Sequence, residues 1–188
     1  MIKKFLSWIL GSTILKNFLS LSIAEFISRL LSVITFAYLA RVLSPQGFGI
    51  LGFASAFVFY FILLVNFGLD TYGTREVANR SYQQSKFVNA VISARLIIAV
   101  PLFIVLIFIA VLLNQNYITK AALIISGINL FSNAISVDWF FQGTQKMKPV
   151  AARQIGVSIL NFVLIIGLVH SQNDVLIAVS ITGLSLLL

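Results

Sequence analysis

The feature that most constrains this chain is a series of long apolar blocks separated by short polar connections. Most blocks are close to the roughly 20 residues that an α-helix needs to cross a hydrocarbon core about 30 Å thick. The blocks are residues 18–40, 48–69, 87–113, 119–141, 150–169 and 175–188. A chain with this pattern is expected to cross a membrane several times.

The blocks are predicted to be helices and not the strands of a membrane barrel. Barrel strands alternate apolar and polar residues over roughly 10 positions, whereas residues 102–113 contain no polar residue. The predicted fold class is therefore all-α, a polytopic transmembrane bundle of about six helices. Pro101 is expected to kink the third helix without breaking it.

The composition excludes most functions of soluble proteins. Hydrophobic residues make up 60% of the chain and charged residues only 10%, whereas soluble domains carry about 25% charged residues. Cys is absent, and 1 His and 5 acidic residues leave little for a metal centre or a hydrolytic site. We therefore expect no enzyme activity, no metal and no cofactor.

The basic residues lie mainly on alternate connections between the blocks. They give the chain a formal net charge of +8, and Lys and Arg in short loops are retained on the cytoplasmic side of a membrane. One side of the predicted membrane holds Lys3, Lys4, Lys16, Arg75, Arg80, Lys86, Lys146, Lys148 and Arg153. The other side holds Arg41 and Lys120. This asymmetry predicts a cytoplasmic N-terminus, and it accounts for the charge without nucleic-acid binding.

The two ends of the chain differ from the blocks between them. Residues 1–17 combine a short apolar run with Lys3, Lys4 and Lys16, so they are predicted to form an interfacial helix on the membrane surface. Residues 18–188 form the predicted transmembrane bundle. Its sixth helix has about 14 residues, or roughly 21 Å of helix, which is too short to cross the hydrocarbon core. We expect an incomplete sixth helix, and a chain that is the first part of a longer transporter.

Two passages of the chain resemble a known family. They run from Ser28-Arg29 through Leu43-Ser44-Pro45 to Gly73-Thr-Arg75-Glu76-Val-Ala78-Asn-Arg80, and over Asp138-Trp-Phe-Phe-Gln142-Gly143-Thr-Gln-Lys146-Met147. Both resemble the polysaccharide (O-antigen type) lipid-linked oligosaccharide flippases of the multidrug/oligosaccharidyl-lipid/polysaccharide exporter superfamily. Many members of that family have an acid where this chain has Asn66.

The resemblance implies an architecture, a function and partners. The expected protein is a two-lobed exporter, of which residues 18–188 form the first lobe. Its expected function is translocation (flipping) of polyprenyl-pyrophosphate-linked oligosaccharide repeat units across the cell inner membrane, for biosynthesis of a surface polysaccharide such as O-antigen or capsule. Membrane lipids, the polysaccharide polymerase and chain-length proteins are further expected partners. The alternatives are a multidrug or metabolite exporter of the same superfamily, and a non-transporting membrane scaffold for glycan assembly.

Four residues are predicted to bind the substrate. An anionic pyrophosphate in a low-dielectric interior needs cationic partners, and a sugar needs amide groups. Arg29 is expected to be the deepest basic residue, and Arg95 is expected near the cytoplasmic end of the third helix. Asn129 and Asn133 supply amides, and their alternative role is hydrogen bonding between helices.

Glu25 and Asp70 are predicted to couple transport to an ion gradient. Glu25 lies one helical turn before Arg29, so these two side chains are expected to pair and to face the bundle interior. Release of Arg29 to the pyrophosphate would leave Glu25 able to bind a proton or a sodium ion. The alternatives are a purely structural pair of Glu25 and Arg29, and a solvated position near the interface for Asp70.

Arg75, Glu76 and Arg80 are predicted to form a gate in a cytoplasmic loop between the second and third helices. The alternative is that they only retain this loop on the cytoplasmic side. Trp139 is expected among the aromatic residues of the membrane interface.

Single-cysteine labelling tests the predicted topology, because the chain contains no Cys. Cysteines placed within residues 70–86 or 142–149 are expected to react only with reagents that reach the cytoplasm. Cysteines within residues 41–47, 114–118 or 170–174 are expected to react with impermeant reagents from outside. Labelling of position 80 from outside would overturn this topology.

Overall fold

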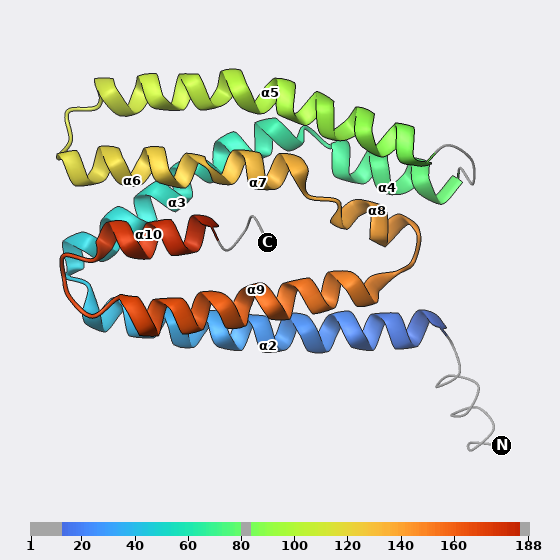
Figure 1. Ribbon diagram of the computed structural model, residues 1–188, viewed down its shortest axis with the longest axis horizontal. Coiled ribbons are helices and arrows are strands. Elements are labelled where there is room, and N and C mark those ends of the chain that lie inside the picture. Colours follow the sequence, from blue (N-terminus) through green and yellow to red (C-terminus); the bar gives the residue numbers. More distant parts are fainter. Residues whose placement is uncertain (1–12, 80–83, 185–188) are drawn as a thin grey trace, which may run out of the picture.

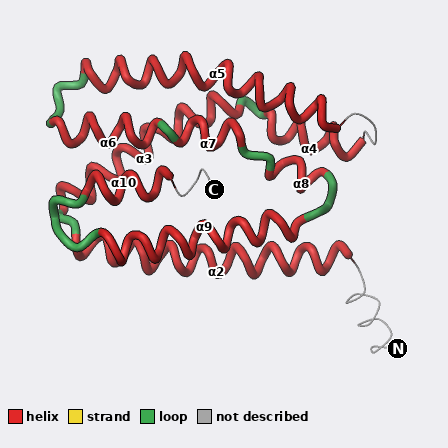
Figure 2. The backbone as a smooth tube through the Cα atoms, viewed as in Figure 1, coloured by secondary structure: helices red, strands yellow, loops and turns green. Residues whose placement is uncertain are grey.

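A computed structural model describes residues 13–79 and 84–184, and all structural statements below concern those residues (Figure 1). Helices make up nearly all of this described part, which contains no strand (Figure 2). The helices are α2 (Thr13–Val42), α3 (Pro45–Asn66), α4 (Leu69–Asn79), α5 (Gln84–Leu112), α6 (Tyr117–Gly127), α7 (Asn129–Ile135), α8 (Asp138–Gly143), α9 (Met147–Leu168) and α10 (Val175–Leu184). The predicted interfacial helix over residues 1–17 lies mostly outside the described residues.

Within the described residues, 5 helical stretches are long and apolar enough to cross a membrane. They are Leu19–Val42, Pro45–Asn79, Ser85–Leu112, Tyr117–Gly143 and Met147–Leu168. Together with α10 they correspond to the predicted blocks. Pro101 lies inside α5, which continues past it as predicted. The prediction of an all-α, multi-pass membrane protein is confirmed.

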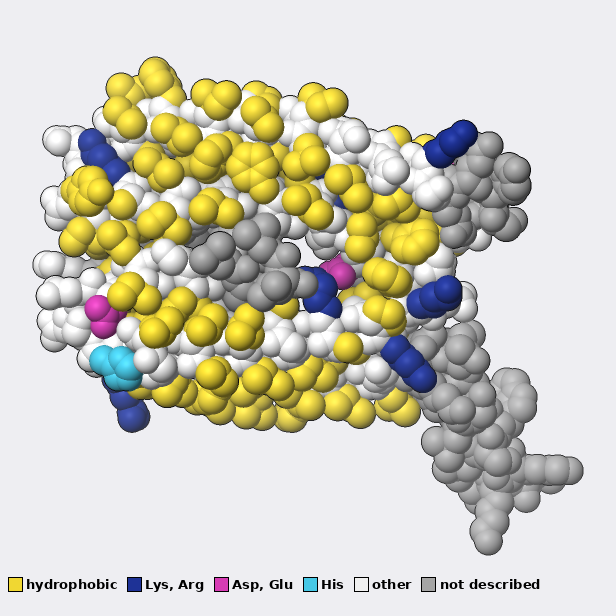
Figure 3. Space-filling view, in the orientation of Figure 1, with side chains coloured by type: hydrophobic (Ala, Val, Ile, Leu, Met, Phe, Trp, Pro, Cys, Tyr) yellow, Lys and Arg dark blue, Asp and Glu magenta, His cyan; other side chains and the backbone are white. Residues whose placement is uncertain are grey.

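The helices run back and forth between two ends of the bundle (Figure 1). At one end, which we call the basic end, α4 and α8 finish and α5 and α9 begin. These helix ends carry Arg75, Lys86, Lys146 and Lys148. Arg41 and Lys120 lie at the opposite end, where α2 finishes and α6 begins. Figure 3 shows basic side chains at both ends of the face that it presents. The predicted grouping of the connections is confirmed, and the side of the membrane that the basic end faces stays a prediction.

The predicted loop over residues 70–86 is wrong, because much of it forms α4. The chain turns at Phe67 and Gly68, whose φ angles of 35° and 77° lie in the left-handed region, and then becomes helical again. Gly73 and Val77 form the buried side of α4. The polar sequence suggested a loop, but one small apolar face is enough to pack a helix whose charged residues remain at least partly exposed.

The predicted fourth helix, residues 119–141, is divided into α6, α7 and α8. A first break follows Gly127, and a second lies at Ser136, whose ψ of 131° is not helical. A break leaves backbone groups without their helical partners, and within a membrane other parts of the protein must bind them. The second break separates α8 from α7 near the basic end.

Three apolar clusters hold the helices together. The first joins α2, α3, α5, α6, α9 and α10, the second joins α3, α5 and α7, and the third joins α4, α5 and α8. Their buried residues include Leu39, Leu51, Leu123 and Val179 in the first, Val58, Leu106 and Leu130 in the second, and Val77, Val91 and Trp139 in the third. As a result α2 and α9 lie side by side on one side of the bundle, and α10 lies between them and α6 (Figure 1).

Asp174 closes the loop between α9 and α10 at the opposite end. Its carboxylate accepts hydrogen bonds from the backbone N–H groups of His170 and Ser171, at 2.9 and 2.8 Å. These bonds favour the ionised form and lower the pKa of Asp174. The stability that they contribute is therefore present above the unfolded-state pKa of Asp, and it is lost as the pH falls through the lower folded-state pKa.

Replacement of Gly73 tests the contact between α4 and α8. A Cβ atom at Gly73 would lie 2.5 Å from Cε3 of Trp139, so an Ala side chain forces the two helices apart. We expect Gly73→Ala to lower the free energy of unfolding in detergent by about 1–3 kcal/mol, the usual cost of overpacking. Gly52→Ala is the matched control, because a Cβ atom there meets nothing within 4 Å. Equal stability of the two variants would contradict this packing.

Candidate functional site

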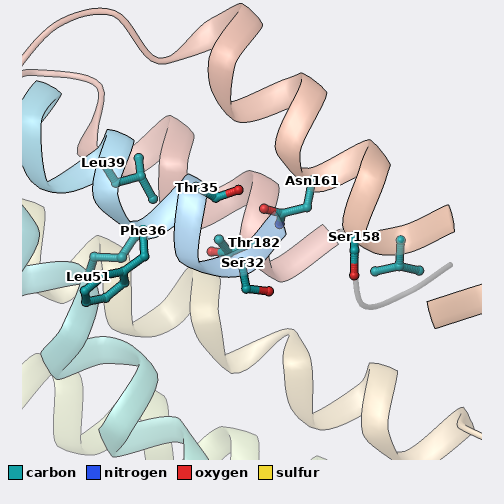
Figure 4. A pocket seen from close by; sticks show the side chains of 9 residues that line it. Ser32, Thr35, Phe36, Leu39, Leu51, Ser158, Asn161 and Thr182 are labelled. Atoms are coloured by element: carbon teal, nitrogen blue, oxygen red, sulfur yellow. The ribbon is translucent and has the colours of Figure 1, made fainter. Parts of the chain in front are cut away.

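Among the described residues, two hollows with polar side chains lie between helices that carry predicted site residues or their neighbours. The first hollow has a volume of about 310 Å³ and lies between α2, α9, α10 and the first half of α3. Its polar lining comes from Ser32, Thr35, Ser158, Asn161 and Thr182 (Figure 4). Figure 4 shows Phe36 and Leu51 together on the apolar side of this hollow. A polar hollow at this depth of a membrane bundle is typical of a ligand site or a water-filled path.

The hydroxyl groups of the first hollow already donate their protons. Ser32, Thr35 and Ser158 each donate to the carbonyl oxygen four residues earlier in the same helix, at 2.8 Å. This bonding satisfies the hydroxyl proton inside a helix. The hydroxyl oxygens keep lone pairs, so they can accept hydrogen bonds from a ligand that carries donors.

The second hollow has a volume of about 170 Å³ and lies between α7, α8 and α9, with Ile62 of α3 at its wall. Its polar lining comes from Asn129, Ser132, Asn133, Ser136, Asp138 and Arg153. Asn129, Ser132 and Asn133 share one face of α7 because residues three and four positions apart lie above one another on a helix. The structure therefore places both predicted amides, Asn129 and Asn133, in one hollow.

Three buried oxygen atoms of α7 have no hydrogen-bond partner among the described residues. They are Oδ1 of Asn129, Oγ of Ser132 and Oδ1 of Asn133. A buried polar atom without a partner costs about 1–3 kcal/mol, and such atoms in native proteins usually indicate an unplaced water molecule or a ligand. These oxygen atoms of the second hollow can therefore bind a hydrogen-bond donor or a cation.

Asp138 and Arg153 form an ion pair across the second hollow. Nε of Arg153 lies 3.2 Å from Oδ1 of Asp138, and Nη2 donates to Oδ2, so the contact is bidentate. Both side chains remain partly accessible, at 36% for Arg153 and 28% for Asp138.

Arg95 and Asp70 form a second ion pair, between α5 and the start of α4. Nη2 of Arg95 lies 2.5 Å from Oδ1 of Asp70, and the Arg95 side chain is completely buried while that of Asp70 is 45% exposed. The structure thus joins two residues that were predicted to have different roles. Asp70 is not simply solvated, because it is the counter-ion of a buried guanidinium.

Arg95 also binds the second break of the divided helix. Its Nη1 donates to the carbonyl oxygen of Ser136 at 3.3 Å, and its guanidinium lies 5.9 Å from the ring centroid of Trp139. Trp139 is only 2% exposed, so its predicted place among interfacial aromatic residues is wrong. The reason is that Gly73 leaves room for the indole ring between α4 and α8.

Glu25 and Arg29 form the predicted pair on α2, with Nη2 of Arg29 2.6 Å from Oε1 of Glu25. The expectation that they face the interior of the described bundle is wrong, since the Arg29 side chain is 78% exposed and that of Glu25 is 48% exposed. The pair lies among exposed apolar residues such as Phe26 and Leu30. Arg95, and not Arg29, is the most buried of the predicted basic residues.

Two of the predicted gate residues, Arg75 and Glu76, lie at the basic end. Arg75 is exposed and Glu76 is half-buried, and both belong to α4 and not to a loop. Arg80 lies outside the described residues.

Sequence reasoning missed Asp138, Arg153 and Ser132 as site residues. Arg153 had been counted only among the residues that set the topology, and Asp138 only as part of a family pattern. One signal was available, because a charge inside a membrane span needs a partner. Nothing comparable in the sequence predicts the helix break at Ser136 that brings Asp138 to Arg153.

No group of three His, Cys, Asp or Glu side chains that could hold a metal ion occurs among the residues described.

Comparison with known proteins places this chain among proteins of polysaccharide biosynthesis. Residues 14–188 match the family described as "Polysaccharide biosynthesis protein". The chain is 32% identical over 169 residues to a protein of Escherichia coli (strain K12) described as "Putative O-antigen transporter". It is 30% identical over 167 residues to a protein of Shigella dysenteriae with the same description.

Each of these alignments covers 87% of this chain, but only 40% and 41% of the two relatives. The chain therefore spans about two fifths of the length of the curated relatives that it matches. No solved structure matches it.

Replacement of Arg95 tests its role at the basic end. Arg95→Met leaves the Asp70 carboxylate without its cation and the Ser136 carbonyl without its donor. We expect a loss of about 3 kcal/mol of unfolding free energy, the lower end for a broken buried ion pair because Asp70 is partly exposed. Lys148→Met, at an exposed position near the start of α9, is expected to change stability by less than about 0.5 kcal/mol. Similar effects of the two substitutions in detergent denaturation would refute this role for Arg95.

Proposed function

Because this chain belongs to the family described as "Polysaccharide biosynthesis protein", we propose that it is part of a transporter that flips a lipid-linked oligosaccharide across the inner membrane. The proposed substrate is a polyprenyl-pyrophosphate that carries an oligosaccharide repeat unit of a surface polysaccharide. The observation that carries this proposal is the pair of polar hollows within an apolar, multi-pass bundle. The names of the two relatives support transport as the activity.

The two hollows suit the sugar part of this substrate. Sugar hydroxyls are both donors and acceptors, and the unpartnered oxygen atoms of Asn129 and Asn133 accept from such donors. The hydroxyl oxygens of Ser32, Thr35 and Ser158 can accept in the same way. A neutral, hydroxyl-rich group also avoids the large cost of placing an unpaired charge in the bundle.

Arg29 and Arg153 are the proposed partners of the pyrophosphate. Each is paired with a carboxylate and is at least one third exposed, so an anionic ligand can reach its guanidinium. Arg95 is less suitable, because it is completely buried and holds both Asp70 and the helix break. Glu25, once released by Arg29, remains a candidate for ion coupling.

The proposed path begins at the basic end, on the cytoplasmic side. Arg75, Glu76 and Arg80 are the proposed gate there. The exposed pair of Glu25 and Arg29 is proposed to face a polar path or a further part of the transporter. Lipid contact is disfavoured for this pair, since charged groups at the centre of a membrane cost about 2.5–3.5 kcal/mol each on insertion scales. The prenyl tail stays in lipid, and the transporter alternates access to the two leaflets without catalysing a reaction.

Transport of a labelled polyprenyl-linked oligosaccharide in vesicles that contain the complete transporter tests the proposed function. Appearance of the oligosaccharide on the far leaflet at a rate above that of empty vesicles is the expected result. Failure to accelerate its appearance would instead favour a scaffold for glycan assembly enzymes. Export of a cationic drug, but not of the oligosaccharide, would favour a multidrug exporter.

Asn133→Leu separates a substrate contact from a structural hydrogen bond. We expect transport to fall about tenfold, which corresponds to the loss of about 1.4 kcal/mol of hydrogen bonding to the substrate. Stability should be unchanged or higher, because the substitution removes a buried oxygen that has no partner. Asn114→Leu, at an exposed position between α5 and α6, is the control and should transport at the parental rate. Unfolding of Asn133→Leu at lower temperature, with normal transport, would assign Asn133 to interhelical bonding.

A further inference from the structure

The second hollow combines residues that carry unpartnered oxygen atoms with a carboxylate. Ser132 is only 7% exposed, and its Oγ has no partner among the described residues, like Oδ1 of Asn129 and Oδ1 of Asn133. All three residues line the hollow together with Asp138. A set of oxygen atoms that no protein donor approaches, next to one negative charge, has the chemistry of a site for a hard cation.

The cation that now neutralises Asp138 is the guanidinium of Arg153. Both its Nε and its Nη2 point at the carboxylate. The Arg153 side chain is 36% exposed, so solvent offers its guanidinium an exit from the hollow. By contrast, the completely buried Arg95 has no such exit from Asp70.

We infer that the second hollow, when no oligosaccharide occupies it, binds a monovalent alkali-metal cation such as Na⁺, which takes the place of Arg153 at Asp138. The proposed ligands are Asp138 and the oxygen atoms of Asn129, Ser132 and Asn133. One carboxylate balances one positive charge, which favours a monovalent ion over a divalent one. The exchange keeps the hollow neutral, because Arg153 leaves when the cation enters.

The divided helix gives this site its shape. Asn129, Ser132 and Asn133 belong to α7, whereas Asp138 begins α8 after the break at Ser136. In a continuous helix Asp138 would follow Asn133 at a spacing of five residues, and its side chain would point away from the face of Asn129. Discontinuous helices place ion ligands in membrane transporters for the same geometric reason.

Trp139 provides a built-in reporter for cation binding. The chain has 2 Trp residues, so Trp8→Phe leaves Trp139 as the single Trp, directly beside Asp138 and 2% exposed. The purified Trp8→Phe protein in detergent is titrated with NaCl, KCl or choline chloride at constant pH and constant ionic strength. Trp139 fluorescence and the midpoint of thermal unfolding are measured at each concentration.

We expect a saturable fluorescence change and a higher unfolding midpoint with NaCl or KCl, and neither with choline chloride. Ser132→Ala removes one ligand and should raise the half-saturating concentration at least about tenfold. Ser180→Ala is the matched control, because its hydroxyl donates to the carbonyl oxygen of Leu176 within α10 and lines neither hollow, and it should leave the titration unchanged. Asp138→Asn should abolish the response to the alkali cations.

Equal responses to the three salts, or an unchanged titration in Ser132→Ala, would overturn this inference. A separate acid titration in choline chloride that changes Trp139 fluorescence, when NaCl and KCl do not, would assign the site to a proton and would overturn it as well. The experiment measures binding and not transport, so its failure leaves the proposed transport function intact. Conversely, a cation response in a protein that does not flip the oligosaccharide would contradict the proposed function and support the cation site.

Discussion

The guanidinium of Arg95 is the group on which the basic end of this bundle depends. A helix that breaks inside a membrane span must find protein partners for its freed backbone groups. Arg95 binds the carbonyl oxygen of Ser136 at such a break, pairs with Asp70 of α4, and lies over the ring of Trp139. One buried side chain therefore connects α4, α5 and α8. The break that it stabilises also turns Asp138 toward Arg153 of α9.

Charged groups and neutral polar groups have different partners in this bundle. The charges at Glu25, Asp70 and Asp138 are each paired with an Arg, which lowers the cost of placing them among apolar helices. By contrast, the side-chain oxygen atoms of Asn129, Ser132 and Asn133 on α7 have no hydrogen-bond partner among the described residues. Paired charges near unpartnered acceptors suit a site that exchanges partners, and this is the basis of both the proposed oligosaccharide path and the proposed cation site.

Sequence reasoning succeeded where the signal was local. Apolar blocks of membrane-spanning length gave the right helices, and the spacing of Glu25 and Arg29 within one helix gave a correct pair. The prediction of a loop over residues 70–86 is wrong, because residues 70–79 pack as part of α4 through Gly73. Sequence reasoning also missed the pair of Asp70 and Arg95, which belong to different helices and lie 25 residues apart in the chain.

The sequence by itself determined that the chain is a multi-pass helical membrane protein, because block length and hydrophobicity are properties of each segment alone. It also determined which connections lie at the same end of the bundle. Consecutive spans run in opposite directions, so every second connection returns to the same end. Only the tertiary structure decided which charges pair, where the fourth span breaks, and that Asn129 and Asn133 face Asp138 and Arg153. These features depend on how helices distant in sequence pack together, and a bulky indole ring fitted against Gly73 sets that packing at the basic end.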